Sequence, residues 1–127
     1  MNVYWYKENQ FMFVKINKNC IILNSHASKQ LSDYAYCRLG INKLEKKIYI
    51  QPVSYDEYDN NKTDYSIIKI NHTRSYSRVN CTDFINTINS KLNLDFNQEK
   101  KLNAQWDDKE KLFVINLEAG GDNNARF

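Results

Sequence analysis

The sequence predicts a single α+β domain in which an antiparallel sheet carries two helices on one face. Three observations support this class. The chain has 127 residues, which is close to the usual size of one domain and short for two. Hydrophobic residues make up 42% of it, which is enough for one core. Short runs of β-branched and aromatic residues alternate with polar turns, as they do in hairpins. Residues 82–92 repeat their apolar positions with the period of a helix.

The chain opens with a predicted hairpin followed by a short helix. Residues 11–16 and 20–23 are rich in Phe, Val and Ile, and they flank the turn-like sequence Asn-Lys-Asn. Asn24 or Ser25 then offers a side-chain oxygen that can accept from the first backbone amides of a helix of two turns. We therefore expect the order strand, strand, helix.

A second hairpin and a loop are predicted next. Residues 35–40 and 47–53 are strand-like and enclose a charged turn. Pro52 should end the second strand because proline cannot donate to a ladder. Residues 54–64 are acidic and rich in Asn, with no apolar period. This stretch is expected to be a solvated loop.

The second half of the chain repeats these kinds of element. Residues 65–70 predict a strand, and Asn80 or Thr82 can cap the amphipathic helix that follows. Residues 101–106 and 111–117 flank a charged turn and predict a closing hairpin.

The order strand, helix, strand, strand therefore occurs twice. This predicts a tandem βαββ duplication with half-repeats 11–53 and 65–117, inside one domain that spans residues 1–117. The alternative is that polar turns between strands recur by composition alone. Residues 118–127 are polar and are expected to form a flexible tail.

Charge and cysteine content narrow the class of protein. Lys and Arg number 18 against 15 Asp and Glu, a net charge of +3 that does not by itself demand a polyanionic partner. No run approaches the ~18 apolar residues that span a bilayer, and the first residues lack the pattern of an export signal. We expect a cytoplasmic protein without a membrane partner. Cys20, Cys37 and Cys81 are widely spaced and odd in number, so we expect no disulfide.

The strongest candidate site is a basic segment before the second helix, formed by Lys69, His72, Arg74, Tyr76 and Arg78. Cationic side chains neutralise phosphates, and a tyrosine ring can stack on a base. An extended backbone would place Arg74, Tyr76 and Arg78 on one face, with about 7 Å between successive side chains. The alternative is a solvated edge strand whose charges prevent aggregation.

No other set of residues predicts chemistry. Cys81 lies near a helix N-terminus, where a thiolate is favoured, but no fixed spacing links it to a histidine. An acidic group could gather a cation, but it lacks the spacing of a calcium loop. Its members are Asp56, Glu57, Asp59 and Asp64. We expect no catalytic residue, no metal ligand and no cofactor, and hence a protein that is not an enzyme.

Aromatic residues exceed what alternating strand faces can bury. They form three groups: Tyr4, Trp5 and Tyr6; Tyr34 and Tyr36; and Tyr55 and Tyr58. Exposed aromatics are common anchors of protein interfaces, so a homodimer or a protein target would use them. The alternative is that they pack on the sheet.

Two stretches carry resemblances to known groups of proteins. Residues 13–53, with the closing hairpin at 106–117, resemble small uncharacterised proteins of prophages and mobile elements in low-GC bacteria. This resemblance implies a mobile-element context. Residues 38–50 resemble the second hairpin of swapped-hairpin transition-state regulators. A βαββ pair with an open sheet face also resembles saddle-shaped and double-wing DNA-binding domains, which implies a nucleic-acid ligand.

The sequence therefore predicts a non-enzymatic nucleic-acid-binding protein that serves a phage or mobile element as an accessory or regulatory factor. The alternative is a phage-encoded inhibitor that uses its aromatic surface and acidic loop to block a host defence protein.

Overall fold

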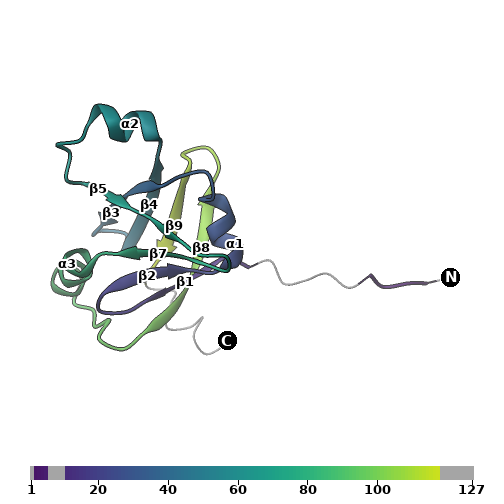
Figure 1. Cartoon of the computed structure of the whole chain (residues 1–127). Coiled ribbons are helices and arrows are strands. Elements are labelled where there is room, and N and C mark those ends of the chain that lie inside the picture. Colours follow the sequence, from purple (N-terminus) through teal and green to yellow (C-terminus); the bar gives the residue numbers. More distant parts are fainter. Residues whose placement is uncertain (1, 6–10, 118–127) are drawn as a thin grey trace.

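The computed structural model describes residues 2–5 and 11–117, so the predicted tail at 118–127 lies outside the described residues. Figure 1 shows the chain folded around a strongly curved sheet. The elements are β1 (Phe13–Ile16), β2 (Cys20–Leu23), α1 (Ser25–Gln30), β3 (Tyr36–Asn42), β4 (Lys47–Val53), α2 (Tyr55–Asn60), β5 (Ile67–Lys69), β6 (Asn71–His72), β7 (Ser77–Asn80), α3 (Thr82–Leu92), β8 (Lys100–Asp107) and β9 (Leu112–Asn116).

The strands form one antiparallel sheet that curls into a nearly closed barrel. Its order is β5-β3-β4-β9-β8-β1-β2-β7-β6. The two edge strands, β5 and β6, are consecutive in the chain. β5 pairs with β3 at one edge of the sheet, and β6 pairs with β7 at the other. Ile70 joins them, is 2% exposed, and donates its N–H to the Ala35 carbonyl at 2.8 Å. One short stretch of chain thus brings both edges of the sheet together.

The barrel interior is filled by alternate strand residues, as expected for strands with one buried face. Large fully buried side chains come from strands of both chain halves, including Ile16 and Ile21 from the first half and Phe113 and Ile115 from the second. Because the inside is packed core, only the outer face of the sheet is open to a ligand. The predicted α+β class with antiparallel strands is confirmed.

Both helices predicted from the sequence are present. Asn24 caps α1, and its Oδ1 accepts from the Ala27 N–H at 3.0 Å. Helix α3 covers the predicted residues, but neither Asn80 nor Thr82 is its N-cap; Cys81 is, without a side-chain hydrogen bond. None of the helices in residues 2–5 and 11–117 is long and apolar enough to cross a membrane.

The helices do not share one face of an open sheet, so that part of the prediction is not confirmed. Helix α1 follows β2 and helix α3 follows β7, and these two strands are antiparallel neighbours. The helices therefore leave the sheet at opposite ends of the strands, as Figure 1 shows. Each closes its own end of the barrel with buried side chains, Leu31 just after α1 and Ile88 of α3 among them.

A third helix occupies the stretch predicted as a solvated loop, and that prediction is wrong. Ser54 is its N-cap, with its Oγ accepting from the Glu57 N–H at 3.1 Å. The Tyr58 ring of α2 stacks on the Tyr36 ring of β3, with centroids 3.8 Å apart. Helix α2 has no buried residue and no apolar stripe, which explains why periodicity did not reveal it. Strand β4 also runs past Pro52 to Val53.

The hairpins β1–β2 and β6–β7 have matching registers and turns. Lys15 lies opposite Ile22 in the first, and Asn71, which is 56 positions after Lys15, lies opposite Arg78 in the second. In the first turn Asn17 Oδ1 accepts from the amides of residues 19 and 20. In the second turn Thr73 Oγ1 accepts from the amides of residues 75 and 76. The turns carry Lys18 and Arg74 at equivalent positions.

The hairpins β3–β4 and β8–β9 also match. Their fourth turn residues, Lys46 and Lys111, have φ of 54° and 57°. This correspondence aligns buried Ile48 with buried Phe113.

The closure of the barrel can be tested at Ile70. We expect Ile70→Ala to lower the free energy of unfolding by about 2–5 kcal/mol, because a buried isoleucine at the junction of both sheet edges would leave a cavity. Chemical denaturation followed by circular dichroism measures the change. Ile22→Ala is the matched control, since Ile22 is half-buried on the outer face, and it should cost about 1 kcal/mol or less. Equal losses in both variants would contradict the closure.

Candidate nucleic-acid interface

The five predicted site residues occupy three kinds of place. Lys69 ends β5 and His72 ends β6. Arg74 lies in the turn between β6 and β7, Tyr76 follows it at the end of the turn, and Arg78 is in β7. All five are exposed.

The segment is not extended throughout, so the three predicted side chains do not form one continuous row. The Thr73 N–H donates to the Tyr76 carbonyl at 2.8 Å, which closes a hairpin turn around Arg74. Tyr76 and Arg78 do lie two residues apart on the outer side of buried Ser77. The structure therefore keeps Tyr76 and Arg78 on one face and places Arg74 at the tip of the turn.

His72 is held by the protein itself. Its Nε2 lies 2.6 Å from the Tyr34 carbonyl oxygen and its Nδ1 lies 2.7 Å from Ser77 Oγ. Ser77 is fully buried, and its Oγ is 2.5 Å from Ser28 Oγ. Since both ring nitrogens have partners, His72 links β6 to the residues before β3 and, through Ser77, to α1. It is therefore poorly placed to bind a phosphate directly.

The sheet register adds cations that the linear sequence did not suggest. Arg78 lies opposite Ile22, Ile22 opposite Lys15, and Lys15 opposite Lys101. Neighbouring strands are ~4.8 Å apart, so Arg78 and Lys15 are separated by about 10 Å. These residues form a transverse row on the outer face of β7, β2, β1 and β8. No signal within one hairpin could have shown it, because the row crosses strands that are far apart in the chain.

A shallow groove of about 370 Å³ lies along this row. Phe13, Lys15 and Ile22 contribute to its lining from the sheet, and Tyr76 from the hairpin turn. Lys101 Nζ lies 3.9 Å from the centre of the Phe13 ring. The groove is therefore lined by two aromatic rings and Lys15, while Arg78 and Lys101 continue the row on its two sides. The outer-face surface formed by Phe13, Lys15, Ile22, Tyr76, Arg78 and Lys101 is called the basic groove below.

The charge of the molecule is unevenly distributed around the barrel. Residues 11–32 and 65–82 contain no Asp or Glu, and the carboxylates of residues 11–117 all lie in 33–64 and 83–117. The acid-free stretches form β1, β2, α1, β5, β6 and β7. Their cations are Lys15, Lys18, Lys29, Lys69, Arg74 and Arg78. Pairing of β2 with β7 joins the two stretches into one positively charged part of the barrel.

Three cations of this part of the barrel, Lys15, Arg74 and Arg78, are not neutralised by carboxylates of the described residues. Within the residues that the structure describes, no carboxylate lies within 4.0 Å of Lys15, Arg74 or Arg78. Their charges therefore remain available to a ligand. Arg38, on the outer face of β3, is different.

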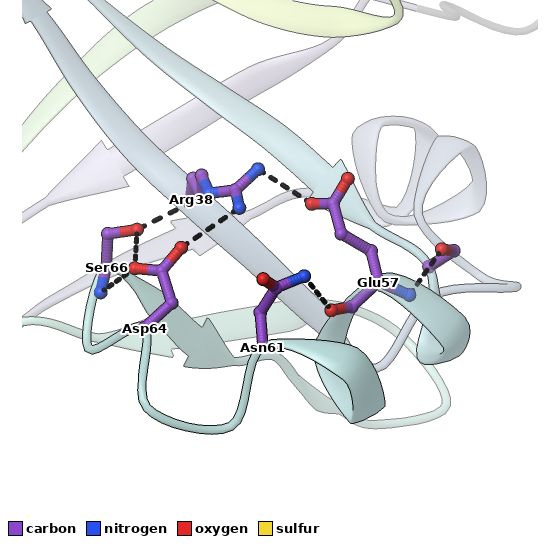
Figure 2. A network of polar contacts seen from close by, with 6 residues as sticks. Arg38, Glu57, Asn61, Asp64 and Ser66 are labelled. Carbon is purple, nitrogen blue, oxygen red and sulfur yellow. Dashed lines mark hydrogen bonds and ion pairs between the residues drawn. The ribbon is translucent and has the colours of Figure 1, made fainter.

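Figure 2 shows that Arg38 is bound by acidic side chains of the α2 region. Its guanidinium is 2.7 Å from Glu57 and 3.1 Å from Asp64. Hydrogen bonds from Ser66, together with Arg38, lower the pKa of the Asp64 carboxyl, and the hydrogen bond to Asp64 raises the pKa of Arg38. This network fastens α2 and its following loop to the barrel.

The remaining chemical candidates do not form a site. Burial raises the pKa of the Cys81 thiol to about 12, and the same cause raises that of Cys37 to about 12. Contrary to the expectation from its place near a helix N-terminus, Cys81 is therefore not a thiolate at neutral pH. In residues 2–5 and 11–117 no three His, Cys, Asp or Glu side chains converge as metal ligands would.

Comparison of the chain with family models, with curated proteins and with solved structures finds no match.

Cysteine labelling tests the burial of the thiols. At pH 8 we expect Cys37 and Cys81 to react with iodoacetamide only when the protein unfolds, because at a pKa of about 12 the thiol stays protonated and the thiolate is the nucleophile. Mass spectrometry of peptides locates the label, and denatured protein is the positive control. Rapid labelling of native Cys81 would contradict the burial.

The Arg38 network can be tested by titration. In Arg38→Ala we expect the pKa of Asp64 to rise but to stay below the ordinary value for aspartate, because the hydrogen bonds from Ser66 remain. Carboxyl chemical shifts measured by NMR across the acid range report it. Asp108, whose pKa is lowered by Lys111 and Trp106, is the internal control and should not change. An unaltered Asp64 titration would contradict the network.

Proposed function

We propose that this protein binds nucleic acid through the basic groove and has no catalytic role. Arg78 and Lys15 contact phosphates, and Tyr76 offers a ring for stacking on a base. Lys101 holds its charge beside the Phe13 ring and extends the contact across β1 and β8. The service of a phage or mobile element, as an accessory or regulatory factor, stays a prediction from the sequence.

The observation that carries this proposal is the concentration of unpaired positive charge on one part of the barrel. Two acid-free hairpins meet there, although the net charge of the chain is only +3. A polyanion gains affinity from such a surface by releasing its condensed counterions.

The other predicted residues take secondary places in the proposal. Lys69 precedes Asn71, the partner of Arg78, by two residues, so it lies on the same outer face. Arg74 can reach a phosphate beyond the end of the groove. His72 supports the hairpin and does not contact the ligand.

We also propose that the chain is a tandem duplication of hairpin, helix and hairpin. The matching turns and registers of the two halves support it. The strand order also supports it, because each hairpin lies beside its counterpart in mirrored order, β3-β4 beside β9-β8 and β1-β2 beside β7-β6. The local twofold axis would pass between Ile22 and Arg78, in the basic groove. This axis would relate Lys18, in the turn between β1 and β2, to Arg74, in the turn between β6 and β7.

A protein-blocking function is the second candidate, favoured by exposed aromatic residues away from the groove. Tyr65 is 91% exposed and Tyr55 66% exposed. Tyr65 lines a separate cavity of about 450 Å³ together with Leu39, Ile68 and Phe84. However, this function would use the acidic stretch 54–64 to bind a positively charged surface of the host protein. Two of its carboxylates, Glu57 and Asp64, are already bound to Arg38.

The proposed function predicts a specific salt dependence. If Lys15 and Arg78 each meet one phosphate, the double variant Lys15→Ala/Arg78→Ala should flatten the slope of log affinity against log salt by about 1.8 on duplex or about 1.4 on a single strand. Fluorescence anisotropy with labelled oligonucleotides between low and moderate salt measures the slope. Tyr76→Ala should weaken single-strand binding by about 1–3 kcal/mol with an unchanged slope.

The matched control is Lys91→Ala/Lys109→Ala, which removes the same charge from exposed residues of α3 and of the β8–β9 turn. We expect it to keep the wild-type slope to within the small effect of net charge. Equal slopes in the two double variants would reject the groove. A pull-down from nuclease-treated host lysate tests the alternative. Recovery of a host protein that is lost with Tyr65→Ala and kept with Lys15→Ala/Arg78→Ala would favour the blocking function instead.

A further inference from the structure

A second concave site lies beside the basic groove, between α1 and the β6–β7 turn. It has a volume of about 270 Å³, and its lining residues are all polar or cationic. Lys29 from α1 and Arg74 from the turn line it together with serine and threonine hydroxyls. No carboxylate lines it. This composition suits a small anion with several oxygens, because cations supply charge and hydroxyls supply hydrogen bonds.

The pocket is connected to a hydrogen-bonded chain that begins at Ser28 on its wall. Ser28 Oγ contacts Ser77 Oγ, Ser77 Oγ contacts His72 Nδ1, and His72 Nε2 contacts the Tyr34 carbonyl. A carbonyl oxygen only accepts, so Nε2 carries a proton. In the neutral imidazole Nδ1 must then accept from Ser77, and Ser77 must accept from Ser28. The Ser28 proton is thus directed into the protein.

A second proton on His72 reverses this chain without breaking a bond. Nδ1 becomes a donor to Ser77, and the Ser77 hydroxyl turns to donate to Ser28 Oγ. The Ser28 hydroxyl proton is then released to donate into the pocket. Ser77 is fully buried between the two, so it can satisfy both directions only by rotating its hydroxyl.

We propose that this pocket binds a phosphate group and that binding takes up one proton at His72. Lys29 and Arg74 line the same pocket as His72, Asp33 precedes Tyr34, and Arg78 follows Ser77, the strand partner of His72. No ion pair joins His72 to a carboxylate within the described part of the chain. A bound dianion attracts the imidazolium that the reversed chain carries. The affinity for a dianion therefore rises as pH falls.

Titration with inorganic sulfate tests the site directly, because sulfate keeps its double charge throughout the range in which histidines titrate, about pH 5.5–8. We expect saturable binding by isothermal calorimetry, tighter at the acid end. Lys29→Ala and Arg74→Ala should each weaken it about tenfold or more, as expected when a charge-assisted hydrogen bond is lost. Lys18→Ala is the matched control, because Lys18 occupies the equivalent place in the other hairpin turn and does not line the pocket.

Two variants separate proton uptake from simple attraction. His72→Gln should retain binding at the alkaline end and lose the rise at the acid end. Ser28→Ala keeps both cations and the histidine, and should reduce the rise. Absence of saturable sulfate binding, or binding unchanged by Lys29→Ala and Arg74→Ala, would overturn the site. An affinity that does not vary with pH in the wild type, or the same rise in His72→Gln, would overturn the proton uptake.

The source of the phosphate is distinguished with oligonucleotides of one sequence that carry a 5′-phosphate or a 5′-hydroxyl. Preference for the phosphorylated strand, lost in Arg74→Ala, would assign the pocket to strand ends. Equal affinities, with sulfate binding retained, would assign it to a free phosphate compound. Sulfate binding is measured without nucleic acid, so this proposal and the proposed function can fail separately.

Discussion

The pairing of β2 with β7 is the contact on which the rest of the structure depends. Each of these strands belongs to a short hairpin that would be marginal by itself. Their ladder joins the two hairpins into one sheet, and β5 and β6 can then close the barrel from both edges. The register also assigns the faces, with Ser77 and Val79 inside and Arg78 outside. A slip by one residue would bury Arg78 and expose Val79.

The same ladder creates the electrostatic character of the surface. Lys15 and Arg78 are 63 positions apart in the sequence, yet they share a row because β1, β2 and β7 are neighbours. Acidic residues are confined to the other stretches, where Arg38 is held by Glu57 and Asp64. Arg38 is thus fastened to carboxylates, whereas Arg78 on β7 is presented to solvent. This division links the fold to the proposed ligand.

The hairpin turn around Arg74 serves two neighbouring surfaces. Tyr76 faces the basic groove, while Arg74 lines the polar pocket beside α1. His72, directly before the turn, is tied to Tyr34 and, through Ser77, to Ser28. A ligand in either surface would therefore act on the same short segment. Because that segment also continues into the junction at Ile70, the closing part of the barrel carries the candidate binding residues.

The sequence by itself determined most of the local elements and pointed to part of the candidate site. Apolar periodicity located α3, side-chain capping located α1 at Asn24, and residue type selected Tyr76 and Arg78. Only the tertiary structure decided that the sheet closes, that α2 exists, that His72 is internally bonded, and that Lys15 joins Arg78. The reason is physical: propensities, caps and turns act over a few residues, whereas strand order and register depend on burying side chains that are distant in the chain.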